Sequence, residues 1–360
     1  MLNGIRILEV EGLGPGPFAA MLLADLGADV ICVHRKGGTV PPGMPEQSIL
    51  DRGKRSIELD LKNEIDVTTF KSLVKTADGL IEGFRPGVME KLGLGPDVCM
   101  DLNPALVFGR MTGWGQESPL SHTAGHDLNY ISLSGALWYG SDPGNEPLTP
   151  PTLVGDIGGG AMYLTVGMLA AILNARSTGK GCEVDTAIYD GSAHMMNLLM
   201  ALRQTGNLDV TRGTSLLDGP YWSRTYRCSD GGFISVQCLE PKVYAQFLSI
   251  LELNEDPAFL NQYDRAAWPT LTDRLTGVFA SHPRDYWAAL FDGTDACVAP
   301  VLNPKEAMAH PMNNRGTWVE AQGALQAAPA PRFSGQADWV APASPTRGQH
   351  TAEILAELGQ

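Results

Sequence analysis

The stretch "IRILEVEGLGPGPFAAMLLADLGADVICVH" (residues 5–34) decides the fold. Its beginning, 5–10, is a short apolar run bounded by glycine, which predicts a buried strand. Residues 18–28 have apolar side chains at helical spacing and a closing glycine, so they predict a helix. The apolar run at 29–34 predicts a second strand. Strand, helix and strand in this order indicate a parallel βαβ unit.

The same alternation continues outward from this stretch. Further strands are expected at 56–61, 79–83 and 105–110, and a helix is expected at 66–77. Strand–helix units in series predict an α/β fold, a Rossmann-like, doubly wound parallel sheet. Ligands of such sheets bind outside the carboxyl ends of the strands.

The pattern changes in the second half of the chain. A long apolar helix is expected at 157–181 and another at 189–204, and 221–239 predicts an antiparallel hairpin with an Asp-Gly-Gly turn. Helices follow at 242–252, 269–280 and 284–291, then an extended, Ala- and Pro-rich segment at 324–346 and a last helix at 351–358. These elements predict a second, smaller α+β domain.

Four segments are therefore expected along the chain. The first is a large Rossmann-like domain that binds the ligand, at 1–190, and a linker follows at 191–216. A small α+β domain occupies 217–315, and a return segment at 316–360 carries the C-terminal helix that joins the large domain.

The overall composition of the chain limits which classes of partner it is expected to bind. Hydrophobic residues make up 44% and charged residues 18%, which is typical of a globular protein. A net charge of −14 argues against a nucleic-acid partner. The N-terminus lacks a signal-peptide pattern and no apolar run reaches about 18 residues, so no membrane partner is expected. Six scattered cysteines without a CxxC pair predict reduced thiols, a cytoplasmic location and no metal site.

The glycine loop at 11–20 lies where a dinucleotide loop would lie, but it fits poorly. Pro15 and Pro17 lack the N–H groups that cradle a pyrophosphate. The second strand ends in the basic residues 34–36, which suits a ligand with a phosphate on its ribose, such as NADP or coenzyme A. A glycine-rich turn that only allows close packing remains the alternative.

Basic residues cluster at the loops beside the expected strands, and in an acidic chain this clustering indicates an anion site. Arg85 is the best single candidate, because an arginine at a strand end beside glycine can approach a phosphate closely. Each of these residues alone could equally be a solvated surface charge. The residues are Arg35, Lys36, Arg52, Lys54, Arg55, Lys62, Arg85 and Lys91.

Three residues are candidates for the chemistry. His126, in "AGHDLNY", can both take and give a proton near neutral pH. Asp156, in "VGDIGGG", directly precedes a predicted helix, so it could be an N-cap, a catalytic group or both, and the glycines at 158–160 are expected to leave room for a ligand. Glu240 precedes Pro241 at an expected helix start and could be an ordinary first-turn acid.

Nearly the whole chain resembles the α-methylacyl-CoA racemases (2-methylacyl-CoA epimerases) of the family III CoA-transferase superfamily. The motif with His126 separates these racemases from the related transferases, which share the aspartate and glycines of "GD-GGG". The matching stretches are "GIRILEVEGLGPGPFAAMLLADLGADV", "IEGFRPGVMEKLGLGP", "RMTGWGQ", "AGHDLNYISLSG", "LVGDIGGGAMYLTVGMLAA" and "GKGCEVDTAIYDGS".

This resemblance implies an isomerase that works as an interlocked homodimer, with each active site between the large domain of one chain and the small domain of the other. His126 and Asp156 match the two proton-transfer residues, and Glu240 matches a glutamate that reaches the histidine from the partner chain. At Lys91 the family has arginine, so its bidentate phosphate pairing is lost. The implied CoA contacts are Arg35, Leu59, Asp60, Leu61, Lys62, Gly83, Phe84, Arg85, Lys91, Gly125, Asp127, Leu128, Asn129 and Tyr130.

The implied reaction moves the proton next to a thioester carbonyl from one face of the carbon to the other, through an enolate. It needs an acid and a base on opposite sides of that carbon, so His126 must start neutral and Asp156 protonated. The pKa of Asp156 must then lie above the usual value of about 3.9, through burial. The helix N-terminus after Asp156 is expected to stabilise the enolate oxygen. CoA is part of the substrate, and no separate cofactor is expected.

Other readings of the same residues remain open. In a CoA-transferase Asp156 would be a nucleophile. A catalytically silent CoA-binding protein would bind acyl-CoA without proton exchange, and an NADP oxidoreductase is disfavoured by the two loop prolines. A surface of Met195, Met196 and Met200 could accept varied acyl chains from branched fatty acids or sterol side chains, although a plain core stripe is the simpler reading.

Overall fold

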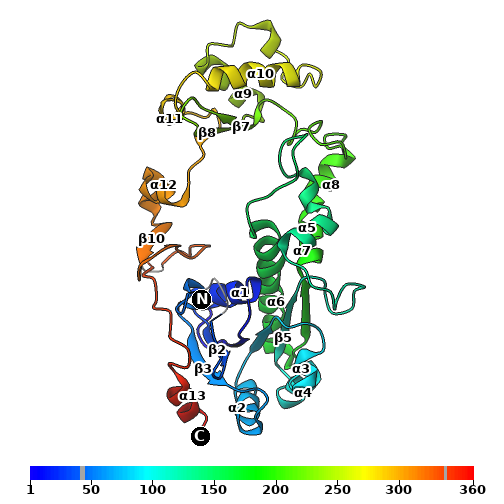
Figure 1. Ribbon diagram of the computed structural model, residues 1–360, viewed down its shortest axis with the longest axis vertical. Coiled ribbons are helices and arrows are strands. Elements are labelled where there is room, and N and C mark those ends of the chain that lie inside the picture. The colour runs from blue at the N-terminus through cyan, green and yellow to red at the C-terminus, as the bar shows by residue number, and fades with distance from the viewer. Residues whose placement is uncertain (41–44, 336–338) are drawn as a thin grey trace. The chain divides into compact units, whose positions relative to one another are not determined.

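The computed structural model describes residues 1–40, 45–335 and 339–360 (Figure 1). The chain divides into two compact units. The first comprises 1–137, 149–196 and 313–360, and the second comprises 138–148 and 197–312. Residues 138–148 thus group with the second unit, although the sequence pattern placed them in the large domain.

The first unit is built on a six-stranded sheet in the order β3-β2-β1-β4-β5-β6, in which all neighbouring strands are parallel. This confirms the predicted α/β fold with a parallel sheet. The strand order reverses between β1 and β4, which is where doubly wound sheets bind ligands. The strands are β1 (Arg6–Val10), β2 (Asp29–Arg35), β3 (Arg55–Leu59), β4 (Gly79–Glu82), β5 (Val107–Thr112) and β6 (Glu183–Ala187).

Helices cover both faces of this sheet (Figure 1). Successive strand residues point to opposite faces, so in β1 Ile7 joins one apolar cluster and Leu8 the other. The cluster around Ile7 contains residues of α1 and α6, and the cluster around Leu8 contains residues of α2, α4 and α13. The helices of this unit are α1 (Pro15–Asp25), α2 (Glu64–Val74), α3 (Val88–Lys91), α4 (Pro96–Leu102), α5 (Asp127–Ser134), α6 (Met162–Thr178), α7 (Ile188–Met195) and α13 (Thr351–Glu357).

A π-helix, η3 (Leu153–Ala161), runs directly into α6. The combined helix Leu153–Thr178 is long and apolar enough to cross a membrane by length and composition alone, a test that core helices of soluble proteins also pass. One side of α6 packs on the sheet through Leu164, Met168 and Ile172. The predicted helix start at 157 was too late, because the helix begins at Leu153.

The second unit contains a three-stranded antiparallel sheet of β7 (Ser223–Arg227), β8 (Phe233–Gln237) and β9 (Val298–Pro300). The first two strands form the predicted hairpin. An aromatic core that includes Tyr221, Trp222, Phe247 and Phe279 packs this sheet against helices. The helices of this unit are α8 (Asn197–Gln204), α9 (Pro241–Ile250), α10 (Trp268–Phe279), α11 (Arg284–Phe291) and α12 (Pro304–Ala309).

The return of the chain to the first unit contains a second hairpin, of β10 (Trp318–Ala321) and β11 (Ala324–Ala327). The prediction of an extended segment from 324 missed this pairing. Short 3₁₀ helices complete the fold at η1 (Ile49–Asp51), η2 (Ala136–Tyr139), η4 (Pro257–Phe259) and η5 (Pro311–Arg315).

Candidate active site

Asp156 lies in the first turn of the π-helix η3, with its side chain half-buried. The N-cap of this helix is Thr152, at φ 60°, so the interpretation of Asp156 as the N-cap is wrong. The backbone N–H of Asp156 instead donates to Oδ1 of Asp127, at 2.8 Å. A carboxylate from a neighbouring helix therefore satisfies an amide that has no partner within its own first turn.

The glycines after Asp156 serve helix packing. A Cβ on Gly159 would lie 2.4 Å from Oγ of Ser192, and a Cβ on Gly160 would lie 3.0 Å from Cγ1 of Ile188. Both contacts are with α7. The expectation that these glycines leave room for a ligand is therefore wrong, since α7 fills the space beside them.

His126 is the N-cap residue of α5 and is exposed. Its backbone N–H donates to Oδ1 of Asn129 at 3.0 Å, which closes the first turn of α5. Asp127, the next residue, is 7% exposed. The sequence "GHD" thus places an accessible imidazole directly beside a buried carboxylate.

Electrostatics connect these side chains to one another. Burial, and next the negative charge of Asp127, raise the pKa of Asp156 to about 6, while His126 acts in the opposite direction. The pKa of Asp156 is thus shifted in the direction that the implied reaction requires. The glycine loop after β1 borders the same carboxyl group, because Oδ2 of Asp156 lies 3.8 Å from the position of a Cβ on Gly14.

Tyr130 connects this site to the loop after β4. Burial and the charge of Asp156 raise the pKa of Tyr130, and Arg85 acts against them. Its hydroxyl donates to the carbonyl of Gly125, and its ring packs edge-on against Trp114 with centroids 4.8 Å apart. A Cβ on Gly113 would lie 2.0 Å from the tyrosine ring, so the glycine of "TGWG" makes room for it. Sequence reasoning assigned no role to Gly14, Gly113 or Trp114.

The expected donor for the enolate oxygen is not a helix end. The N–H of Ile157, directly after Asp156, donates to the carbonyl of Thr152 at 3.0 Å, in the ladder of the π-helix. The helix N-terminus lies before Asp156, at Leu153. The prediction that a helix N-terminus follows Asp156 is therefore wrong.

A groove of about 480 Å³ lies outside the carboxyl ends of β1, β2, β3 and β4. Six of the implied CoA contacts line it, namely Arg35, Leu59, Asp60, Leu61, Lys62 and Phe84. A hollow of about 510 Å³ shares Leu61, Lys62 and Leu92 with the groove and is lined also by Lys71 and Lys91. The residues from Gly125 to Tyr130 lie instead at α5, around Asp156. A role for any of these residues in CoA binding stays a prediction.

Three of the basic residues that indicated an anion site are bound inside the protein. Nζ of Lys54 lies 2.5 Å from Oε2 of Glu9, and both side chains are buried. Arg52 pairs with Asp25 at 2.5 Å and Arg55 with Asp29 at 2.7 Å. These cations hold the segment before β3 in place, so an anion-binding role for them is wrong.

Glu11 adds negative charge at the mouth of the groove. Burial opposes its ionisation, but the imidazole of His34, 3.3 Å away, and hydrogen bonds from Arg347 and the N–H of Arg35 hold the pKa of Glu11 at about 2. Arg347 and Glu11 therefore neutralise each other, and the exposed Arg35 and Lys62 are the lining cations that remain for a phosphate.

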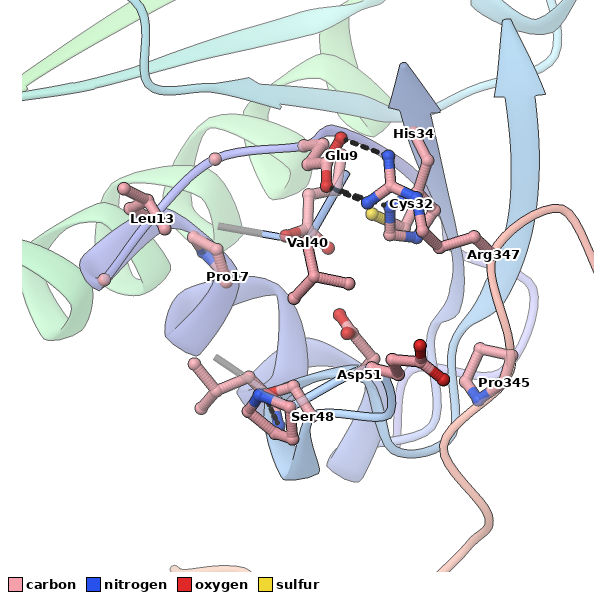
Figure 2. Close-up of a pocket in the computed structure, with 16 residues that line it drawn as sticks. Glu9, Leu13, Pro17, Cys32, His34, Val40, Ser48, Asp51, Pro345 and Arg347 are labelled. Carbon is pink, nitrogen blue, oxygen red and sulfur yellow. Dashed lines mark hydrogen bonds and ion pairs between the residues drawn. The ribbon is translucent and has the colours of Figure 1, made fainter. Parts of the chain in front are cut away.

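A smaller cavity of about 60 Å³ lies beside the glycine loop (Figure 2). Glu9, Cys32 and Asp51 could together hold a metal ion, since their ligand atoms lie within 4.8 Å of one another. However, Nζ of Lys54 lies 2.5 Å from Glu9 and 3.5 Å from Asp51. The lysine supplies the positive charge that these carboxylates need, so the donor set does not fit a metal ion.

Two predictions concern residues at or beyond the boundary of the first unit. Glu240 belongs to the second unit, where it precedes α9 at the N-cap position without a side-chain capping bond. Its role toward His126 stays a prediction.

Met195, Met196 and Met200 are half-buried or exposed, so they do not form a plain core stripe.

Comparison with known proteins identifies the class to which this fold and site belong. Residues 2–351 match the family described as CoA-transferase family III, and the chain belongs to this family. It is 39% identical to the alpha-methylacyl-CoA racemase of Mus musculus, over 100% of this chain and 93% of that one. It is 38% identical to the alpha-methylacyl-CoA racemase of Homo sapiens, over 99% of this chain and 93% of that one. The crystal structure of a CAIB/BAIF family protein from Brucella suis superimposes with a TM-score of 0.82, at 26% identity, over 99% of this chain and 98% of that one.

Proposed function

We propose that the protein is an isomerase that interconverts (2R)- and (2S)-2-methylacyl-CoA thioesters. The observation that carries this proposal is the arrangement of two proton-transfer groups, the exposed imidazole of His126 and the half-buried carboxyl of Asp156, whose charges act on each other. Two relatives named alpha-methylacyl-CoA racemase, which match over nearly the full chain, support it.

The chemistry follows from the protonation states. In one direction neutral His126 removes the proton next to the thioester carbonyl, and protonated Asp156 delivers a proton to the opposite face of the carbon. In the other direction ionised Asp156 is the base and the imidazolium is the acid. A pKa of about 6 leaves part of Asp156 protonated near neutral pH, so the pair can share a single proton.

We propose that the CoA portion of the substrate binds in the groove outside β1–β4, against Arg35 and Lys62. Arg85 follows the same end of β4 and acts on Tyr130, so the loop after β4 connects the groove to the proton-transfer site. The acyl chain would come from branched fatty acids or sterol side chains. No cofactor besides the CoA of the substrate is needed for this chemistry.

We further propose a cytoplasmic, interlocked homodimer in which Glu240 of the small domain reaches the other chain's proton-transfer site. The exposed apolar side of α6 supports a second protein surface there, because Val166 and Leu173 are 64% and 71% exposed. Leu198, in α8, is 72% exposed.

The decisive experiment follows one stereoisomer. A (2R)-2-methylacyl-CoA is incubated in heavy water with the wild type, His126→Ala and Asp156→Asn. We expect the wild type to incorporate deuterium at C2 and to give a mixture of epimers, and both variants to lose epimerisation by at least about 10²-fold. Chirality retained by the wild type without deuterium uptake would contradict the proposal.

Transfer of CoA between carboxylates is the second candidate, and the family description favours it. In that reaction ionised Asp156 would attack the thioester carbonyl, release the CoA thiolate and form a mixed anhydride. The two functions separate cleanly, since a transferase needs an acceptor carboxylate and a racemase exchanges the C2 proton without one.

A further inference from the structure

Asp127 is linked to both proton-transfer residues, to His126 through the chain and to Asp156 through a hydrogen bond. It follows His126 directly and opens α5, while its Oδ1 accepts the backbone N–H of Asp156 at 2.8 Å. The side chain is nearly fully buried, at 7% exposure. No ion pair with Asp127 is found among the described residues, and burying a carboxylate is costly, so its position calls for an explanation.

The surrounding residues make room for this contact. A Cβ on Gly155 would lie 2.4 Å from Oδ1 of Asp127 and 2.8 Å from Cγ2 of Ile131. Only glycine at 155 allows the carboxylate to reach the amide of the next residue. The glycine before Asp156 and the aspartate after His126 are therefore two parts of one contact.

We propose that Asp127 is a positioning residue: its buried carboxylate accepts the amide of Asp156 and so fixes the first turn of η3, which carries the proton-transfer carboxyl. The negative charge of Asp127 also opposes the ionisation of Asp156. This inference rests on the proposed proton transfer. It differs from the role as a CoA contact that the family resemblance implied for Asp127, because the carboxylate is turned toward η3.

The ionisable groups that act on the pKa of Asp156 lie on α5. From α5, Asp127 raises the pKa of Asp156, His126 lowers it, and Tyr130 responds to its charge. On α7, burial and next the charge of Asp185 of β6 raise the pKa of Asp190. The first turn of α1 has no acidic residue. Further ionisable groups of the packed elements have partners of their own. Tyr163 of α6 contacts His194 of α7, Arg176 of α6 pairs with Asp78, and Arg110 of β5 pairs with Glu82 and with Glu183 of β6. Asp25 of α1 pairs with Arg52, and the ring of Tyr189 of α7 packs against Trp114.

Asp127→Asn separates charge from geometry, because the amide oxygen of asparagine can still accept the N–H of Asp156. In the direction in which ionised Asp156 is the base, protonation of Asp156 sets the acid limb of the pH profile of kcat/KM. We expect this limb to move to lower pH by about one unit in Asp127→Asn, since a like charge beside Asp156 has been removed. Asp127→Ala, which also loses the acceptor, should show the same shift and in addition a lower kcat at every pH.

A second readout does not depend on activity. In protein labelled with ¹³C at aspartate Cγ, the resonance lost in Asp156→Asn identifies Asp156, and its titration should move to lower pH in Asp127→Asn. Asp97→Asn, which removes an exposed first-turn aspartate of α4, is the matched control and should leave the titration unchanged. If the wild type exchanges no C2 proton but the titration shifts, the proposed reaction fails and the positioning role stands. An unchanged titration in Asp127→Asn overturns the inference.

Discussion

At Asp156, two neighbours act on one carboxyl group in opposite directions. Burial and Asp127 favour its neutral form, and His126 favours its ionised form. The identity of His126 and Asp156 as a candidate pair could be predicted from motifs. Their mutual placement could not, because it depends on the contact of Asp127 with the amide of Asp156, which joins residues 29 apart in the chain.

The raised pKa of Asp156 has a cost in stability. Its folded pKa, about 6, lies above the ordinary aspartate value of 3.8, so ionisation destabilises the folded state as pH rises through this window. We expect Asp156→Asn to raise the free energy of unfolding by about 1 kcal/mol at pH 8, after allowance for partial solvent screening. The gain should vanish at pH 4, where the acid is protonated in the folded state. Urea unfolding at both pH values tests this, and equal gains at the two would contradict it.

At the scale of elements, apolar runs predicted β1 to β5 because each of these strands is buried on both faces of the sheet. The edge strand β6 was missed, since its first three residues are exposed or half-buried and show no apolar run. The start of η3 was also missed. Its N-cap, Thr152, is a residue type that often starts helices, but it lies in the left-handed region and makes no side-chain capping bond.

The close packing of η3 on α7 leads to a prediction for Gly159. A Cβ there would meet backbone as well as side chain, at 2.7 Å from N of Ser192 and 2.9 Å from O of Ile188, so the two helices must move apart. We expect Gly159→Ala to lower the free energy of unfolding by about 1–3 kcal/mol, and to reduce epimerisation because Asp156 shifts with η3. Chemical unfolding and kcat measure the two effects.

Gly277→Ala is the matched control for this substitution. Gly277 lies inside α10, and a Cβ there has nothing within 4 Å. This variant should be stabilised by up to about 1 kcal/mol, because alanine is the better helix former. If Gly159→Ala behaved like Gly277→Ala, the packing argument for η3 would be wrong.

At the scale of the whole molecule, the basic residues show the limits of sequence reasoning most clearly. Eight were expected to indicate an anion site, but Arg52, Lys54 and Arg55 are held by carboxylates of other elements. Charge patterns reveal that cations are near a strand end, whereas long-range ion pairs decide which of them a ligand can use. Of the other five, Arg35 and Lys62 line the groove where doubly wound sheets bind ligands.

The proposed homodimer gives a prediction at this scale. A charge on the exposed apolar side of α6 would have to be buried on association, so Val166→Glu with Leu173→Glu should shift the protein from dimer to monomer. Light scattering coupled to size exclusion measures the mass. Ile65→Glu, at a residue that is 76% exposed on α2, should leave the mass unchanged. A dimeric double variant would contradict a role for this side of α6.

The π-helical form of η3 means that the direction of the Asp156 carboxyl depends on residue count as well as residue type. Each step along an α-helix turns the side chain by about 100°, and a π-helical segment accommodates a longer run per turn. Deleting one residue between Thr152 and Asp156 would thus swing the carboxyl around the helix axis by roughly a quarter turn. Relatives that differ by a single insertion here would aim the same aspartate at a different face of the substrate.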